Sequence, residues 1–373
     1  MTKRIILTLV VLLQFVPGAF AQNDRRDLIK TRLEPLIEKT MRDNQVPGFA
    51  IGIIENGKVI YAKGFGVAKL GDNKPITSKS LFHMASVTKP FVATAIMQLV
   101  ECGKVNLDAH VTEYLPYFRM KDERFAMITV RQMLGHISGM PDVEDYHWDK
   151  PEYDDHALES YVRRLSDLSL IAAPGEKFEY SNMAFEVLGD VIAKVSGESF
   201  ESYMQRNIFK PLGMKHSTLL VREADQKLLT SPHILSGSSV TVSNVFPYNR
   251  AHAPSSTLYS NIDDMNRWAL ANLNRGELNG KRILKESSYD LLWKPQMDAG
   301  RRGQIGLSWF LTTRVGHRII YHGGTDVGFN SSITLAPDDS ISIVAMSNFL
   351  PDKNGYASQI ANPIIDMMLS EKK

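Results

Sequence analysis

Runs of hydrophobic residues near both ends of the chain have the lengths and spacing of β-strands. Two of them, 49–54 and 59–67, are joined through Asn56 and Gly57. An Asn-Gly pair between apolar runs predicts a tight hairpin, because both turn residues then adopt positive φ. Strand patterns return late in the chain, over 306–313, 318–321, 330–335 and 340–347. The short turns between these late runs require antiparallel pairing.

Helical spacing of hydrophobic residues dominates the chain between these groups of strands. Pro35 lies inside the first helical pattern and implies a kink or a late start there. The stretch 231–248 fits either a short hairpin or an extended loop. The predicted helices are 27–41, 90–100, 181–195, 200–208, 263–273 and 357–369. We therefore expect an α+β fold: a mixed antiparallel sheet built from both chain ends and flanked by helices, with a mostly helical region inserted.

The first 21 residues have the three-part pattern of a secretory signal. Lys3 and Arg4 precede the apolar run 5–16, and small residues occupy the positions before Gln22 that a signal peptidase reads. The apolar run is too short to span a bilayer. We expect cleavage after Ala21 and a secreted or periplasmic mature protein without a stable membrane anchor.

Charge and cysteine content argue against nucleic-acid binding and rule out an internal disulfide. Residues 1–21 carry two basic and no acidic residues, so their removal lowers Lys+Arg from 43 to 41, equal to Asp+Glu at 41, and the formal net charge falls from +2 to 0. Without a basic excess or a long basic run there is no electrostatic reason to expect nucleic-acid binding. The single cysteine, Cys102, cannot form an internal disulfide and is expected to be a buried apolar residue near a helix end.

The first candidate for chemistry is Ser86-Val87-Thr88-Lys89, at the start of a predicted helix. Residues three apart share a helix face, so the Lys89 ammonium can reach the Ser86 hydroxyl. A serine hydroxyl is a poor nucleophile until a neighbouring group takes its proton. The helix N-terminus also offers free N–H groups to a developing oxyanion. The same pattern fits a surface serine beside a solvated lysine, so the motif does not decide alone.

The second and third motifs are Tyr180-Ser181-Asn182 and His322-Gly323-Gly324-Thr325. A tyrosine beside a lysine can act as a general base, and an asparagine amide can bond both a lysine and a substrate carbonyl. Asn182 could instead simply cap the following helix. Glycines after the strand 318–321 let a substrate backbone approach, and the Thr325 N–H is free to bind an oxyanion. The third motif also fits a plain glycine-rich turn.

Together the three motifs resemble those of the serine β-lactamase-like family, which includes class C β-lactamases, DD-peptidases, D-aminopeptidases and family VIII carboxylesterases. Its members carry Ser-x-x-Lys, Tyr-x-Asn and a Lys- or His-x-Gly triplet in this order. The flanking sequence is similar at 84–90, 134–139, 174–176, 211–214 and 328–329. The resemblance covers nearly all of the mature chain. It implies a β-lactamase/penicillin-binding-protein-like fold, with a sheet domain over 22–85 and 298–373, a mostly helical domain over 86–297, and the active site between them.

The resemblance also implies a role for each motif residue. Ser86 would be the nucleophile, Lys89 its proton partner and Tyr180 the general base. Asn182 would position lysine and substrate, and the N–H groups of Ser86 and Thr325 would form the oxyanion hole beside Gly323 and Gly324. His322, which could orient a substrate carboxylate or relay a proton, stands where β-lactamases usually place a lysine. The missing fixed positive charge favours a peptidase or an esterase over a true β-lactamase.

The sequence thus predicts an exported serine hydrolase, acting through an acyl-enzyme on small peptide, amide or ester substrates, with peptidoglycan fragments among the candidates. A class C-type β-lactamase and an inert penicillin- or peptidoglycan-binding protein of the same fold are the alternatives. An inert relative should have lost Ser86, Lys89 or Tyr180, and all three are present. The acidic stretch 142–156 has no metal-ligand spacing and is expected to be a solvated loop, so we expect no metal and no cofactor.

Overall fold

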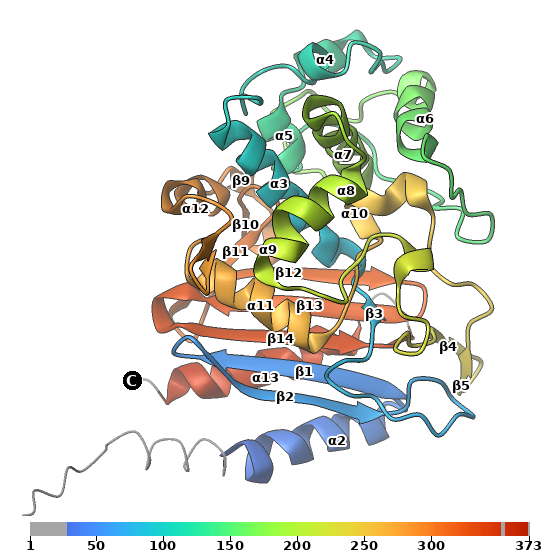
Figure 1. Cartoon of the computed structure of the whole chain (residues 1–373), viewed down its shortest axis with the longest axis vertical. Coiled ribbons are helices and arrows are strands. Elements are labelled where there is room, and N and C mark those ends of the chain that lie inside the picture. The colour runs from blue at the N-terminus through green and yellow to red at the C-terminus, as the bar shows by residue number, and fades with distance from the viewer. Residues whose placement is uncertain (1–27, 352–354, 372–373) are drawn as a thin grey trace, which may run out of the picture.

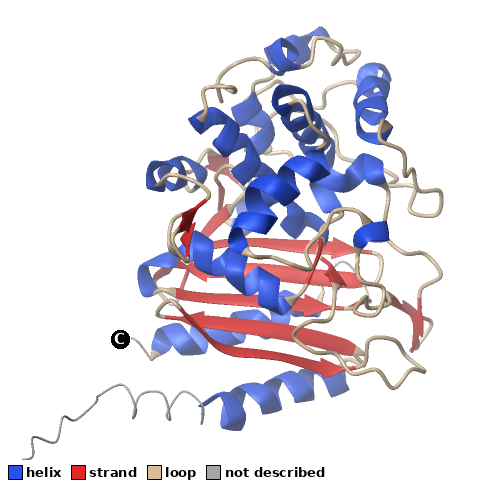
Figure 2. Ribbon diagram, viewed as in Figure 1, coloured by secondary structure: helices blue, strands red, loops and turns tan. Residues whose placement is uncertain are grey.

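The computed structural model describes residues 28–351 and 355–371, so the signal sequence predicted over 1–21 lies outside the described residues. An eight-stranded sheet occupies the centre of the molecule, and all of its neighbouring strands are antiparallel (Figures 1 and 2). Its order is β2 (Lys58–Gly66), β1 (Gly48–Glu55), β14 (Ile341–Ser347), β13 (Phe329–Ala336), β12 (His317–Asp326), β11 (Phe310–Arg314), β10 (Gln304–Ile305) and β9 (Met297–Asp298). The sheet therefore joins the two ends of the chain, as the sequence predicted.

Two strand pairs and a three-stranded sheet lie around this sheet. They are β3 (Phe82–His83) with β6 (Tyr259–Ser260), β7 (Glu277–Leu278) with β8 (Lys281–Arg282), and β4 (His233–Ser236) between β5 (Ser239–Val242) and β15 (Phe349–Leu350). The ambiguous stretch 231–248 thus contains a short hairpin.

Helices cover both faces of the sheet. On one face lie the π-helical turn η1 (Ile29–Leu33), α2 (Glu34–Asp43) and α13 (Tyr356–Ser370), whose apolar side chains share a core with β1 and β14. On the other face α11 (Ile262–Leu273) packs against β1 and β14. Gly52 of β1 allows this close contact, because a Cβ there would lie 2.2 Å from the Asn266 side chain.

The mostly helical region lies beyond α11, at the top of Figure 1. Its α-helices are α3 (Lys89–Glu101), α4 (Val111–Tyr114), α5 (Val130–Leu134), α6 (Ala157–Arg164), α7 (Asn182–Ser196), α8 (Phe200–Met204), α9 (Lys210–Leu212), α10 (Ala253–Ser256) and α12 (Glu286–Leu292). Short 3-10 and π turns complete the structure: η2 (Ala85–Thr88), η3 (Glu123–Met127), η4 (Leu165–Asp167), η5 (Gln205–Phe209), η6 (Val221–Glu223), η7 (Arg250–His252), η8 (Gly300–Arg302) and η9 (Pro337–Asp339).

Alternation along the central strands divides the core into two parts. In β14, Ile341, Ile343 and Ala345 point towards α13, whereas Val344 and Met346 belong to the core under the helical region. Side chains alternate in this way because successive Cβ atoms point to opposite faces of a sheet. Each fully buried Ile or Met contributes about 1.5–3 kcal/mol, so the two cores together hold the sheet between its helical layers.

Several local predictions are confirmed. Asn56 and Gly57 adopt φ of 49° and 73°, as the β1–β2 hairpin requires. Pro35 lies in the first turn of α2, directly after the π-helical turn η1, so the helical segment is irregular just before the proline, in line with its missing N–H and not with a late start.

Three local predictions are wrong. Ser308 has φ of 72°, so the strand expected from residue 306 begins only at Phe310. β12 continues to Asp326, because it stays paired with β13, and the His-Gly-Gly-Thr motif therefore lies within a strand. Cys102 is exposed, because it caps the C-terminus of α3 where the chain turns back at the surface.

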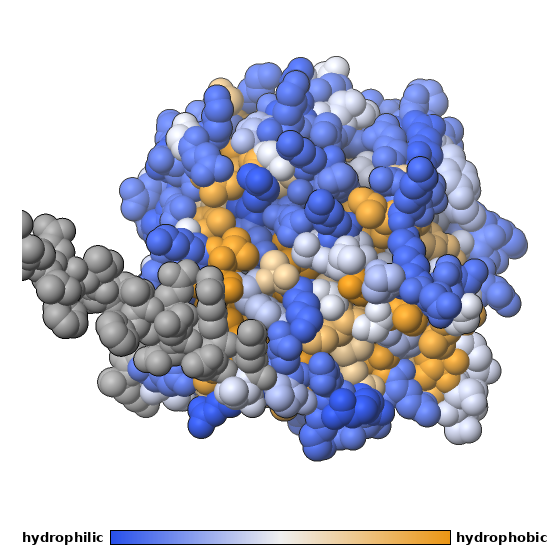
Figure 3. Space-filling view, turned by 60° about the horizontal axis from the view of Figure 1, so that its bottom comes forward, coloured by the Kyte–Doolittle hydropathy of each residue, from blue (hydrophilic) through white to orange (hydrophobic). Residues whose placement is uncertain are grey.

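The exterior is mixed in character. Figure 3 shows a face where hydrophilic side chains surround several separate apolar patches. Within residues 28–351 and 355–371, every helix is too short or too polar to cross a bilayer.

Candidate active site

Ser86 lies in the turn η2, one residue after a strained backbone position. Ala85 adopts φ of 47°, which costs a non-glycine residue on the order of 1–3 kcal/mol and persists only where the surroundings enforce it. Here the Ser331 hydroxyl of β13 donates to the carbonyl oxygen of Met84 over 2.5 Å. The turn that carries Ser86 is thereby attached to the central sheet.

Lys89 begins α3 and is fully buried. Its Nζ donates to Ser86 Oγ over 3.0 Å, to the Ser255 carbonyl oxygen over 2.9 Å and to Asn182 Oδ1. These three acceptors match the three donors of an ammonium group. The spacing predicted from the Ser-x-x-Lys motif therefore exists as a direct contact.

Tyr180 and Asn182 reach Lys89 from the start of α7. Ser181, not Asn182, caps this helix, because its hydroxyl accepts from the Ala184 N–H. The Asn182 side chain is therefore available to the lysine. The Lys89 Nζ lies 5.1 Å from the centre of the Tyr180 ring, a cation–π distance. Among the described contacts, the Tyr180 hydroxyl bonds neither Ser86 nor Lys89.

The Tyr180 ring also stacks on a buried histidine. The rings of His136 and Tyr180 stack with centroids 4.2 Å apart. Burial, reinforced by the charge of Lys89, holds the pKa of His136 well below its usual value. The imidazole is therefore neutral and acts as a flat packing surface.

The third motif presents one edge of β12 to Ser86. Pairing between β11 and β12 ends at Phe310 and Tyr321, whereas pairing with β13 continues to Asp326. The other edge of β12 is consequently open from His322 onward. Beside this edge, Gly324 allows β12 to approach the nucleophile closely: a Cβ there would lie 2.4 Å from Met84 O and 2.8 Å from Ser86 N.

His322 is buried and uncharged. Burial, followed by the charge of Lys89, lowers the pKa of His322 to about 3. Its Nδ1 lies 2.8 Å from the Gly323 carbonyl oxygen, so Nδ1 carries the proton and donates. The other nitrogen, Nε2, is buried and has no hydrogen-bond partner among the described residues. It is an acceptor that a bound group can satisfy.

These residues share a cavity of about 600 Å³, within the usual range for small-molecule sites. Seven of the eight residues predicted from the motifs line this cavity. The eighth, Lys89, lies behind Ser86 and Asn182. Five further lining residues carry charge or a phenol and were not predicted: Asp142, Tyr146, Arg302, Tyr321 and Asp326.

The loop over 142–156 is only partly the solvated loop that the sequence suggested. Asp145 and His147 do pair at the surface. Tyr146 and Trp148, however, stack on one another with centroids 4.6 Å apart and turn inwards onto His252. Alternation of polar and aromatic residues over 145–148 was the available signal for this inward face.

Arg302 and Asp326 bring opposite charges to the cavity. The Arg302 guanidinium lies over the rings of Tyr180 and Phe310, 5.2 and 5.3 Å from their centres. Asp326 Oδ2 lies 2.8 Å from Nε2 of His83, whose side chain is fully buried. No cluster of three or more His, Cys, Asp or Glu side chains suited to a metal ion exists in the part of the chain described.

Known proteins share this architecture. A solved penicillin-binding protein homologue from Pyrococcus abyssi superposes with a TM-score of 0.82 at 26% identity, over 91% of this chain and 77% of the other. The hydrolase EstCE1 gives 0.79 at 21% identity, over 93% and 100%. A D-amino acid amidase from Ochrobactrum anthropi SV3 gives 0.76 at 20% identity, over 92% and 98%.

Sequence comparison gives a consistent result. Protein flp of Staphylococcus aureus (strain MW2) is 29% identical over 349 residues, which cover 92% of this chain and 67% of that protein. Esterase EstB of Burkholderia gladioli is 29% identical over 215 residues, 53% of each chain. The beta-lactamase family matches residues 33–361, nearly the whole of the described fold. The chain therefore belongs to the beta-lactamase family.

Proposed function

We propose that this protein is an exported serine hydrolase that forms an acyl-enzyme on Ser86. The observation that carries this proposal is the 3.0 Å hydrogen bond from Lys89 Nζ to Ser86 Oγ, at the floor of a cavity bordered by the open edge of β12. Nucleophilic catalysis by serine needs a neighbouring group that manages the hydroxyl proton, and this contact supplies one.

In the proposed reaction, Ser86 Oγ bonds to the substrate carbonyl carbon while its proton passes to the phenolate oxygen of Tyr180, whose ring the Lys89 ammonium faces. The N–H groups of Ser86 and Thr325 bind the oxyanion. Collapse of the tetrahedral intermediate breaks the bond to the leaving group, which takes the proton from Tyr180. Water then attacks the ester and releases the acid. The Tyr180 hydroxyl must approach Ser86 Oγ for this step, and catalytic hydrogen bonds of this kind often form or tighten only when substrate binds.

His322 fits a binding role better than proton transfer. A pKa of about 3 leaves its imidazole neutral at physiological pH. Its unprotonated Nε2 can accept a hydrogen bond from substrate but carries no positive charge to offer a carboxylate. Arg302 supplies that charge instead, because its guanidinium lines the same cavity and its field lowers the pKa of His322.

The favoured substrates are small peptides, amides or esters, with a DD-peptidase- or D-aminopeptidase-like activity or an esterase activity. Peptidoglycan fragments are included in this class. The cavity is large enough for such molecules, and structural and sequence relatives include a D-amino acid amidase, the hydrolase EstCE1 and the esterase EstB. Arg302 favours substrates that carry a carboxylate. Because the positive charge of Arg302 could also bind the carboxylate of a β-lactam, β-lactamase activity is the second candidate.

A substrate panel tests this proposal. It consists of D-Ala-D-Ala peptides, D-amino-acid amides, short-chain esters and a chromogenic cephalosporin. We expect turnover of a peptide, amide or ester with a higher kcat/KM than the cephalosporin. Preferred cephalosporin turnover would favour the β-lactamase, and binding of all four without turnover would favour an inert binding protein. N-terminal sequencing of secreted protein tests the proposed cleavage after Ala21.

A further inference from the structure

The buried Lys89 ammonium touches only neutral acceptors. Its three hydrogen bonds go to a hydroxyl, a side-chain amide and a backbone carbonyl, from Ser86, Asn182 and Ser255 respectively. A fully buried charge is costly unless opposite charge lies nearby. The compensating charge must therefore come from the next layer of residues.

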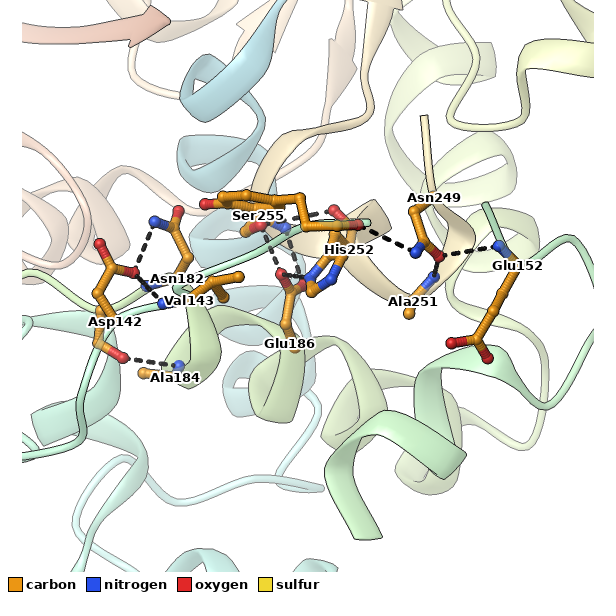
Figure 4. Close-up of polar contacts among 12 residues, drawn as sticks. Asp142, Val143, Glu152, Asn182, Ala184, Glu186, Asn249, Ala251, His252 and Ser255 are labelled. Atoms are coloured by element: carbon orange, nitrogen blue, oxygen red, sulfur yellow. Dashed lines mark hydrogen bonds and ion pairs between the residues drawn. The ribbon is translucent and has the colours of Figure 1, made fainter. Parts of the chain in front are cut away.

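One carboxylate lies behind Asn182. Asp142 Oδ1 accepts from the Asn182 backbone N–H over 2.8 Å and from its Nδ2 over 2.7 Å (Figure 4). These bonds fix which way the amide faces, because Nδ2 points to Asp142 and Oδ1 to Lys89. A carboxylate on the donor end of an amide also makes its carbonyl oxygen a stronger acceptor.

A second carboxylate lies behind Ser255. Glu186 is fully buried on α7, one turn after Asn182 and on the same face. Its Oε1 accepts from Ser255 Oγ over 2.5 Å, and its Oε2 accepts from the Ser255 N–H over 3.2 Å (Figure 4). Both donors of Ser255 are thus held by one carboxylate, which fixes the carbonyl group that receives Lys89. His252 Nδ1 lies 3.0 Å from the same Oε1.

We propose that Asp142 and Glu186 are positioning residues for Lys89, each acting through one of its neutral acceptors. Asp142 fixes and polarises the Asn182 amide, and Glu186 fixes the Ser255 carbonyl. The two negative charges also stabilise the protonated forms of the titratable groups in the site. This inference rests on the proposed acyl-enzyme function, and it concerns two residues that the three sequence motifs do not contain.

The effect on pH dependence has a definite sign. Without one of these negative charges, nearby groups lose their protons at lower pH. The pH at which the labelling rate is half-maximal therefore decreases. Other charges and titratable groups around Lys89 and the two carboxylates stay the same in such variants. They are Tyr146, Tyr161, Tyr180, His83, His136, His252, His322, Arg302 and Asp326.

The experiment measures the rate of Ser86 labelling by a fluorophosphonate as a function of pH, so it needs no natural substrate. The variants are Asp142→Asn and Glu186→Gln, which keep size and remove charge. Asp142 is exposed, so its variant should fold even if the buried one does not. The controls are Glu144→Gln on the same loop and Asp190→Asn on α7, whose buried carboxylate accepts from the Tyr117 hydroxyl at 2.6 Å.

We expect each charge-removing variant to label about tenfold more slowly, with the half-maximal pH lower by about half a unit or more. Both controls should keep the wild-type half-maximal pH. Ser255→Ala should slow labelling without moving that pH, because Glu186 stays charged. Half-maximal pH values equal to wild type in Asp142→Asn and Glu186→Gln would overturn this inference alone. Wild-type protein that is not labelled at Ser86 would overturn the proposed function and this inference with it.

Discussion

Ser331 Oγ donates to the Met84 carbonyl oxygen over 2.5 Å, which ties strand β13 to the turn that carries Ser86. The two residues are 247 positions apart in the chain. Gly324 of the neighbouring strand lies against the same carbonyl. The nucleophile is therefore positioned by the late strands of the sheet as much as by its own helix.

Substitution of the two motif glycines tests this arrangement. In Gly324→Ala the added Cβ would lie 2.4 Å from a backbone oxygen, whereas in Gly323→Ala the nearest atom is 3.7 Å away. Forcing a methyl group into close-packed backbone costs about 1–3 kcal/mol. We expect Gly324→Ala to lower the Tm clearly more than Gly323→Ala and to slow Ser86 labelling more. Equal effects in the two variants would contradict the close contact between β12 and η2.

The buried His322 makes folding stability depend on pH. The pKa of His322 is about 3 in the folded chain, against an ordinary value of 6.5. Between these values the unfolded chain binds a proton that the folded chain does not, so stability falls as pH falls below 6.5. This single group should cost about 2 kcal/mol at pH 5.

Urea unfolding at pH 7 and pH 5 measures this effect. His322→Gln should lose about 2 kcal/mol less than wild type between the two pH values, since it has no such group to protonate. His216→Gln, at an exposed position, serves as the control and should behave like wild type. An unchanged pH dependence in His322→Gln would show that His322 is not buried in the neutral form.

Arg302 should determine the preference for substrates with a carboxylate. Arg302→Met keeps a long side chain over the Tyr180 and Phe310 rings but removes the charge. We expect the KM of carboxylate-bearing substrates to rise about tenfold, in line with loss of one charge-assisted hydrogen bond of roughly 1.5–3 kcal/mol, and the KM of neutral esters to stay the same. The neighbouring Arg301→Met is the matched control. Equal changes for charged and neutral substrates would exclude this role.

Tyr180→Phe separates proton transfer from packing. The ring keeps its stacking on His136 and its place under Lys89, so the fold should be retained. Loss of a general base lowers kcat by roughly 10²–10⁴-fold. Tyr153→Phe at an exposed position controls for loss of a phenol. Wild-type turnover in Tyr180→Phe would require another base, of which Lys89 is the nearest.

The sequence predicted the parts of this structure that depend on local chemistry. Asn56 and Gly57 predicted the first hairpin because their turn type needs particular residues, and Ser86 and Lys89 lie three apart on one helical start. The end of β12 was not predictable, because glycines read as a turn and only pairing with β13 keeps them extended. Asp142 and Arg302 were missed for a similar reason. Their places beside Asn182 and Tyr180 arise from contacts distant in sequence, which no local pattern encodes.

The proposed hydrolysis depends on Ser86 being the nucleophile. Fluorophosphonate labelling followed by peptide mapping by mass spectrometry identifies the modified residue directly. We predict one adduct, on the peptide that contains Ser86, and no labelling or turnover in Ser86→Ala. The fold of this variant should persist, because the lost hydroxyl removes a single hydrogen bond with Lys89, worth about 1.5–3 kcal/mol. An adduct on another serine, or labelling that persists in Ser86→Ala, would contradict the proposed mechanism.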